Sequence, residues 1–324
     1  MNSRRAQLLQ WFEDGAIAPE QIFPALAATG VTSDGARWQR FLDQLTLVLG
    51  TLALVCAVGF FIAYNWDAMG RWTQFALVQA LMVVAVVVYW MLGTEKITAR
   101  LGLLAAALLL GALLALHGQT YQTGADSWQL FATWALLMLP WTLVSRFAAL
   151  WLLLLLLLNL ATALYFLTFG GLFWTVFNTT DRILWLLLLL NTTAWIAWEL
   201  AAVRLEWLAY RWAVRLIATA SGTAMTMLVL FAIFEPGPLP LLAWLAFAIW
   251  LGAVYFIYRR RRLDLFMLAG ACLALIICVT SLLAKLMLHG NDLAGIFLLL
   301  SLLVVAQAAT AAIWLRRVHS GQSS

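Results

Sequence analysis

The residues best suited to bind a ligand lie between His117 and Asp126, where the chain reads HGQTYQTGAD. This stretch offers an imidazole, amides, hydroxyls, a phenol and a carboxylate, and strongly apolar segments lie on both sides of it. A loop that only connects two helices needs no such density of hydrogen-bonding side chains. We therefore expect a recognition site here, although the pattern specifies no reaction.

Two other polar turns carry residues of the same kind. One turn contains Asn65 and Asp67, and the other contains Lys285 and His289. Lys285 and His289 are four residues apart, so they share one helix face. If the three turns meet, they form one pocket; alternatively, each turn only caps its helices, as Asp126 would do. The candidate ligand-binding residues are His117, Gln119, Tyr121, Asp126, Asn65, Asp67, Lys285 and His289.

No catalytic residue, cofactor or metal site is predicted. The sequence contains no HExxH motif and no pair of aspartates in the middle of an apolar segment. Cys56, Cys272 and Cys278 lie within apolar runs and form no CxxC motif. Neither a disulfide framework nor a thiolate metal site is therefore expected.

The composition indicates a membrane environment. Of the 324 residues, 65% are hydrophobic and 10% are charged, and the mean hydropathy is +0.96. Too few polar side chains remain to cover a water-soluble globule, so we expect a polytopic membrane protein whose main partner is the lipid bilayer. The net charge of +5 does not indicate nucleic acid, because the basic residues fall in the loops of one membrane face.

Ten segments reach or approach the roughly 20 apolar residues that a spanning helix needs. The weakest boundary lies between the fourth and fifth segments, where only Ser145 and Arg146 interrupt the apolar run. Without this break the chain would have nine helices and its two ends on opposite sides. We expect an all-α polytopic membrane helix bundle of ten transmembrane helices. They cover about residues 44–64, 72–92, 100–118, 128–145, 147–168, 183–201, 212–234, 239–258, 263–287 and 293–315.

The distribution of basic residues supports ten helices and sets their orientation. With the N-terminus inside, 16 of the 19 Lys and Arg residues lie in cytoplasmic segments, so both termini are expected in the cytoplasm. Residues 1–41 are expected to form a small cytoplasmic helical cap, residues 42–318 the transmembrane domain, and residues 319–324 a short cytoplasmic tail. The cap is either a packing or insertion element or a docking module for a partner.

Few polar residues lie in the middle of the apolar segments. The acidic residues occur in the cap, in loops or near predicted helix ends, which disfavours a proton-coupled carrier. Asn159 and Asn191 would reach similar middle depths in antiparallel neighbours, where an amide in hydrocarbon seeks a partner. We expect a hydrogen bond between helices there, with a substrate contact as the alternative.

Three motifs carry a family resemblance: LLQWFEDGAIAPEQ at 8–21, AYNWDAMGRW at 63–72 and LHGQTYQTGAD at 116–126. With these motifs the chain resembles a bacterial family of predicted membrane proteins, domain of unknown function 2157, over roughly residues 1–160. The most specific part is the run from Gln119 to Tyr121, followed by Gly124 and Asp126. The resemblance implies a multi-helix inner-membrane protein and no established activity.

Three functional hypotheses follow. The first is a non-enzymatic inner-membrane protein that binds a small polar ligand, a lipid head group or an envelope protein partner at its extracytoplasmic face. The alternative is a ten-helix transporter of the drug/metabolite type, in which helices one to five superpose on six to ten in inverted orientation. Its fifth and sixth helices are rich in Leu and poor in small residues, which counts against this alternative. A membrane-embedded enzyme is third, and it requires the histidines and carboxylates to converge on one cavity.

Overall fold

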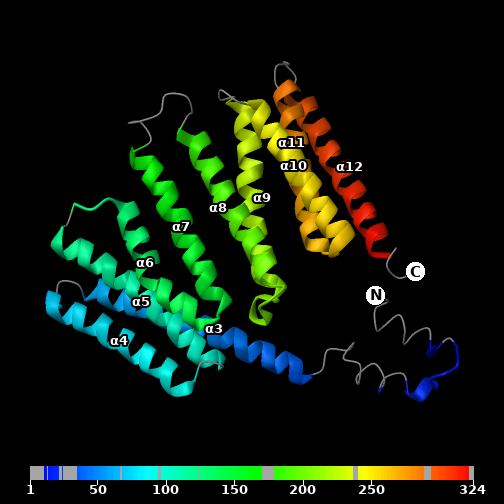
Figure 1. Cartoon of the computed structure of the whole chain (residues 1–324). Coiled ribbons are helices and arrows are strands. Elements are labelled where there is room, and N and C mark those ends of the chain that lie inside the picture. Colours follow the sequence, from blue (N-terminus) through cyan, green and yellow to red (C-terminus); the bar gives the residue numbers. More distant parts are fainter. Residues whose placement is uncertain are drawn as a thin grey trace. The chain divides into compact units, whose positions relative to one another are not determined.

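Ten long α-helices make up most of the described part of the chain (Figure 1). The computed structural model describes residues 11–12, 14–21, 24, 35–65, 68–93, 96–122, 124–169, 179–235, 240–287 and 293–320. Within these residues every regular element is helical and no strand is present, so the predicted all-α membrane helix bundle is confirmed. The helices are α3 (Gly35–Tyr64), α4 (Arg71–Leu92), α5 (Ile97–Tyr121), α6 (Ser127–Ser145), α7 (Ala148–Phe169), α8 (Thr179–Ala201), α9 (Arg211–Phe234), α10 (Pro240–Phe256), α11 (Leu265–Met287) and α12 (Leu293–Ser320).

Among the described residues, nine of these helices are long and apolar enough to cross a membrane. The remaining long helix is α6, which has 19 residues and contains Pro140. The chain is therefore a multi-pass membrane protein.

A sharp break separates α6 from α7, at the boundary that the sequence marked least clearly. Arg146 has a left-handed backbone with a φ of +48°, a conformation that commonly ends a helix. The Phe147 N–H donates a hydrogen bond to the Ser145 hydroxyl oxygen at 3.3 Å, which secures the turn. The two helices then pack along each other, so this predicted break is present in the structure.

Two helices run further than the sequence indicated. α12 continues to Ser320 rather than 315, and α5 extends to Tyr121 rather than 118. α3 begins at Gly35, ahead of the expected span at 44–64. α5 passes through Gly118 because neither a glycine nor an exposed polar side chain is enough to end a helix with well-packed neighbours. It stops where Gln122 adopts a left-handed φ of +44°. The first half of the polar stretch, His117–Tyr121, is therefore helix.

The predicted N-terminal cap lies largely outside the described residues. Its described part contains a short 3₁₀ turn, η1 (Pro19–Gln21), and the beginning of α3. The cap and most of the tail stay predictions.

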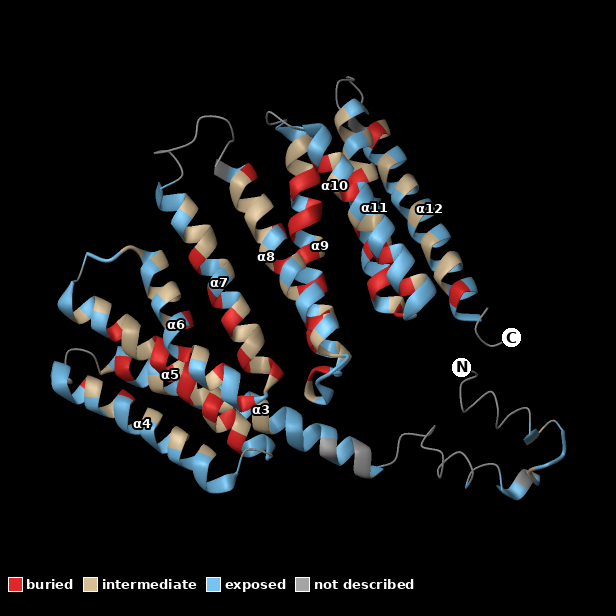
Figure 2. Ribbon diagram, in the orientation of Figure 1, coloured by how far each residue is buried: buried red, intermediate tan, exposed pale blue. Residues whose placement is uncertain are grey.

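Two helices have the most buried surfaces in the bundle (Figure 2). Half of the apolar stretch of α5 and of α9 is buried, compared with 6 to 22% in the other spans of the described chain. α5 packs against α4, α6 and α7, whereas α9 packs against α8, α10 and α11. Both lie in a compact unit formed by Thr51–Ala306; Met1–Gly50 and Gln307–Ser324 form a second unit.

Close contact between α5 and α6 depends on Gly111. The Trp134 ring lies directly over this glycine, where a Cβ atom would overlap the indole carbons. The Trp134 indole N–H donates to the Ala107 carbonyl of α5 at 2.8 Å. The absent side chain thus lets a tryptophan of α6 pack and hydrogen-bond on α5.

Asn159 of α7 and Asn191 of α8 form the predicted hydrogen bond between helices. Each amide nitrogen donates to the carbonyl oxygen of the other side chain, at 3.2 and 2.6 Å. The same nitrogens also donate to the Leu155 and Leu187 carbonyls of their own helices. Both amides are therefore satisfied in a region where hydrocarbon offers no partner.

We predict that Asn159→Leu lowers the free energy of unfolding by about 1–2 kcal/mol, because it leaves the Asn191 amide without its partner. The double variant Asn159→Leu/Asn191→Leu is expected to recover most of this loss, since neither polar group then remains. Unfolding by SDS titration in mixed micelles measures both effects. Thr193→Val is the control, because this hydroxyl bonds only to its own helix. Additive losses in the double variant would contradict the coupling.

Candidate functional site

His117 and Tyr121 lie four residues apart at the end of α5, and both are exposed. Their ring centroids are 4.8 Å apart. Phe75, near the start of α4, adds a third ring, 6.0 Å from Tyr121 and 6.4 Å from His117. These separations fall in the range of favourable ring contacts. The three rings, which we name the α4–α5 aromatic cluster, form a partly exposed surface carrying an imidazole and a phenol.

Two buried polar groups occur at the ends of the neighbouring helices. The Thr120 hydroxyl of α5 and the Trp128 indole N–H of α6 have no hydrogen-bond partner among the described residues. Tyr165 and Phe169 of α7 pack against the Trp128 ring, with centroid distances of 5.1 and 6.4 Å. A buried polar group without a partner costs about 1–3 kcal/mol. Both groups are therefore candidates to bind the polar part of a ligand.

The other predicted residues at this end differ in their contacts. Gln119 is exposed on α5. The Asn65 amide donates to the Phe61 carbonyl at 2.9 Å, so this side chain closes the end of α3. Asp126 occupies the N-cap position of α6, but its side chain makes no capping hydrogen bond. The capping alternative thus describes Asn65 and not Asp126.

Lys285 contacts α9. Its ammonium group donates to the Ile233 carbonyl in the last turn of α9, against which α11 packs. α5 instead packs against α4, α6 and α7. Asp67 and His289 lie outside the described residues, so the predicted meeting of three polar turns stays a prediction.

A charged network that the sequence did not predict joins α8, α9 and the start of α11. Arg211 donates to Glu199 and to Asp264, with nitrogen–oxygen distances of 2.9 Å in both pairs. Arg215, one turn further along α9, contacts the other oxygen of Asp264 at 3.1 Å. The Asp264 side chain is only 4% exposed. Two arginines thus neutralise a buried carboxylate.

The network continues through η3 (Ile257–Arg261), a π-helical turn that follows α10. The Tyr258 hydroxyl donates to Glu199 at 2.6 Å and accepts a hydrogen bond from the Trp195 indole at 3.0 Å. The Trp195 and Tyr258 rings stack with an interplanar angle of 4°. Arg262 reaches the second Glu199 oxygen at 3.1 Å. One set of contacts therefore ties four segments together.

The sequence held one signal of this network, the spacing of Arg211 and Arg215 on one helix face. Burial raises the pKa of Asp264, but hydrogen bonds from Arg211 and Arg215 outweigh burial and hold this pKa below its ordinary value. The carboxylate is therefore ionised at neutral pH. Its role in this geometry is to hold α9 and α11 together.

Metal ligands do not gather in the ranges that the structure describes: no three His, Cys, Asp or Glu side chains come close enough to hold an ion. Cys56, Cys272 and Cys278 are all free thiols. The groups offered for binding near His117 are rings, amides, hydroxyls and the Asp126 carboxylate.

We predict that Asp264→Asn lowers the free energy of unfolding at pH 7 by about 1–3 kcal/mol, because it weakens charge-assisted hydrogen bonds from two arginines. The pKa of Asp264 is lower in the folded protein, so its contribution is complete above the ordinary carboxyl pKa of about 4 and is lost as the pH falls through the folded value. The difference between wild type and variant should therefore shrink below about pH 4. SDS titrations at pH 7 and at low pH measure it; a constant difference would contradict the assignment.

Comparison with known proteins finds a similarity in the first part of the chain. Residues 9–151 match the family described as predicted membrane protein (DUF2157). No curated protein and no solved structure matches the chain. The matched range includes α4, α5 and α6, and with them the α4–α5 aromatic cluster and Asp126. The resemblance seen in the motifs is thus confirmed: residues 9–151 are similar to the DUF2157 family of predicted membrane proteins, and the match does not extend to the rest of the chain.

Proposed function

We propose that this protein is a bacterial inner-membrane binding protein whose extracytoplasmic end recognises a ligand carrying an amine or ammonium group. The ligand is a small polar molecule or a lipid head group; an envelope protein that presents such a group is the third form of the proposal. Both termini lie in the cytoplasm in this arrangement, because it gives the cytoplasmic side 16 of the 19 basic residues.

The observation that carries the proposal is the α4–α5 aromatic cluster. Three rings from two helices lie within 6.4 Å of one another, and two of them are exposed. Aromatic faces attract ammonium groups by about 0.5–2 kcal/mol for each well-placed ring. A cluster of rings at the end of a spanning helix also lies at the depth where aromatic side chains meet lipid head groups.

Polar groups nearby suit the remainder of such a ligand. Asp126 supplies a carboxylate that is not used for capping, and it complements a positive charge. The buried Thr120 hydroxyl and Trp128 N–H have no partner among the described residues, and they suit acceptor oxygens such as those of a phosphate. Gln119 adds an exposed amide.

The other hypotheses have weaker support. The ten-helix transporter would require an inverted relation between the first and second halves of the bundle. The enzyme would require His117 and His289 to share one cavity with carboxylates. The contacts of the described residues support neither the inverted repeat nor the shared cavity. The binding protein is therefore the proposal that we test.

We predict that His117→Ala and Tyr121→Ala each lower the binding of phosphatidylethanolamine by about fivefold, because each removes one ring of the cluster. The purified protein is titrated with this lipid in detergent and bound lipid is counted by native mass spectrometry. Soluble phosphoethanolamine is added as a competitor; competition would identify the head group, rather than the acyl chains, as the recognised part.

Tyr64→Ala is the matched control, because Tyr64 is a 90% exposed aromatic residue at the end of α3 and is not part of the cluster. Its variant is expected to bind like the wild type. Equal binding by all four proteins would exclude an ammonium site at the cluster.

A further inference from the structure

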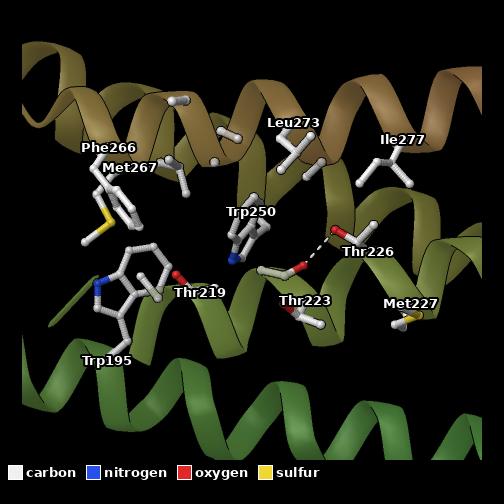
Figure 3. Close-up of a pocket in the computed structure, with 17 residues that line it drawn as sticks. Trp195, Thr219, Thr223, Thr226, Met227, Trp250, Phe266, Met267, Leu273 and Ile277 are labelled. Atoms are coloured by element: carbon white, nitrogen blue, oxygen red, sulfur yellow. Dashed lines mark hydrogen bonds between the residues drawn. The ribbon is translucent and has the colours of Figure 1, made fainter. Parts of the chain in front are cut away.

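A cavity of about 400 Å³ lies between α9, α10 and α11, with Trp195 of α8 at one end (Figure 3). Its floor contains small buried side chains, including Ala218, Ala271 and Ala274. Its rim is exposed and includes Leu273, which is 58% exposed. The cavity is therefore a groove that opens on the surface of spanning helices, where the surrounding solvent is lipid.

The length of the groove matches one leaflet of a bilayer. It follows α9 from Ala218 to Met227 and α11 from Phe266 to Ile277. At 1.5 Å of rise per residue these stretches span about 14 and 17 Å. The hydrocarbon core of a bilayer is about 30 Å thick, so the groove covers about half of it. One extended acyl chain fits this length.

The lining is apolar except for the indole N–H groups of Trp195 and Trp250 and a row of threonine hydroxyls. Figure 3 shows Trp250 between α9 and α11, facing Thr219, Thr223 and Thr226 of α9. The Trp250 indole N–H is buried and has no hydrogen-bond partner among the described residues. An N–H group in hydrocarbon calls for an acceptor oxygen, which an acyl ester has and a plain hydrocarbon chain lacks.

One end of the groove adjoins the charged network. The Arg215 guanidinium lies over the ring of Phe266, a lining residue, at 5.4 Å. Trp195, which also lines the groove, donates to Tyr258 in η3. The run Arg259–Arg262 begins directly after Tyr258. Arg211, Arg215 and this run together supply six arginines, whereas the network contains two carboxylates, Glu199 and Asp264. This end of the groove therefore carries a net positive charge at the level of lipid head groups.

We propose that this groove binds one anionic phospholipid, with an acyl chain along α9 and α11 and its phosphate at the Arg215 end. The apolar floor contacts the chain, the Trp250 N–H donates to an ester oxygen, and the arginines attract the phosphate. The site is independent of the proposed function, because it is built from α8 to α11 and lies outside residues 9–151.

Gly270→Leu tests the groove directly. A Cβ atom added at Gly270 meets no other atom within 4 Å, so a leucine there fills the groove without a forced clash at its first carbon. Gly252→Leu is the matched control, since Gly252 is equally open but lies on α10 outside the lining. The full-length protein is titrated with phosphatidylglycerol in detergent, and retained lipid is counted by native mass spectrometry.

The wild type and Gly252→Leu are expected to retain phosphatidylglycerol, and Gly270→Leu to retain at least about fivefold less, as expected from the loss of chain contacts with the groove. Equal retention by all three proteins, or an equal loss in both variants, would overturn the proposal. A change from monomer to dimer mass in Gly270→Leu without a change in lipid would also overturn it, in favour of contact with a second copy.

The charge requirement has its own test. Wild type should prefer phosphatidylglycerol to phosphatidylcholine, Arg215→Gln should lose most of this preference, and Arg215→Lys should keep it because the charge remains. An unchanged preference in Arg215→Gln would overturn the phosphate assignment. His117→Ala is expected to retain phosphatidylglycerol like the wild type, which separates this site from the α4–α5 aromatic cluster.

Discussion

Hydrocarbon offers no hydrogen-bond partner, and this constraint accounts for most polar contacts in the described helices. Asn159 and Asn191 pair with each other, and the Thr192 and Ser221 hydroxyls meet at 2.7 Å between α8 and α9. Asp264 is surrounded by arginine donors. Each of these polar groups is thus joined to a group on another segment, and these bonds help to fix which helices are neighbours.

The same constraint makes the buried polar groups that lack partners candidates for binding a ligand. The Thr120 hydroxyl and the N–H groups of Trp128 and Trp250 are buried and unpaired among the described residues. The Thr120 hydroxyl and the Trp128 N–H belong to the helices at the end that carries the α4–α5 aromatic cluster. The Trp250 N–H lies along the open groove. A polar ligand would complete both places, which is why we assign binding to each.

The two buried helices organise these places separately. α5 supplies His117 and Tyr121 and packs within the part of the chain that matches the DUF2157 family. α9 supplies Arg211, Arg215 and the threonines of the groove, and it lies outside residues 9–151. Recognition of an ammonium group and binding of an anionic phospholipid are therefore assigned to different halves of one membrane protein, each built around its own central helix.

The sequence by itself determined the membrane environment, nine of the spanning helices to within a few residues, and the Asn159–Asn191 contact. These properties follow from apolar length and from the cost of an unpaired amide, which are local to each segment. It did not reveal that α5 continues through Tyr121, because helix ends depend on packing as well as on residue type. The ring contact of Phe75 with His117, the pairing of Arg211 with Asp264 across 53 residues, and the groove below Trp250 were decided only by tertiary structure. Each requires the relative position of helices far apart in the chain, which hydropathy and charge patterns do not specify.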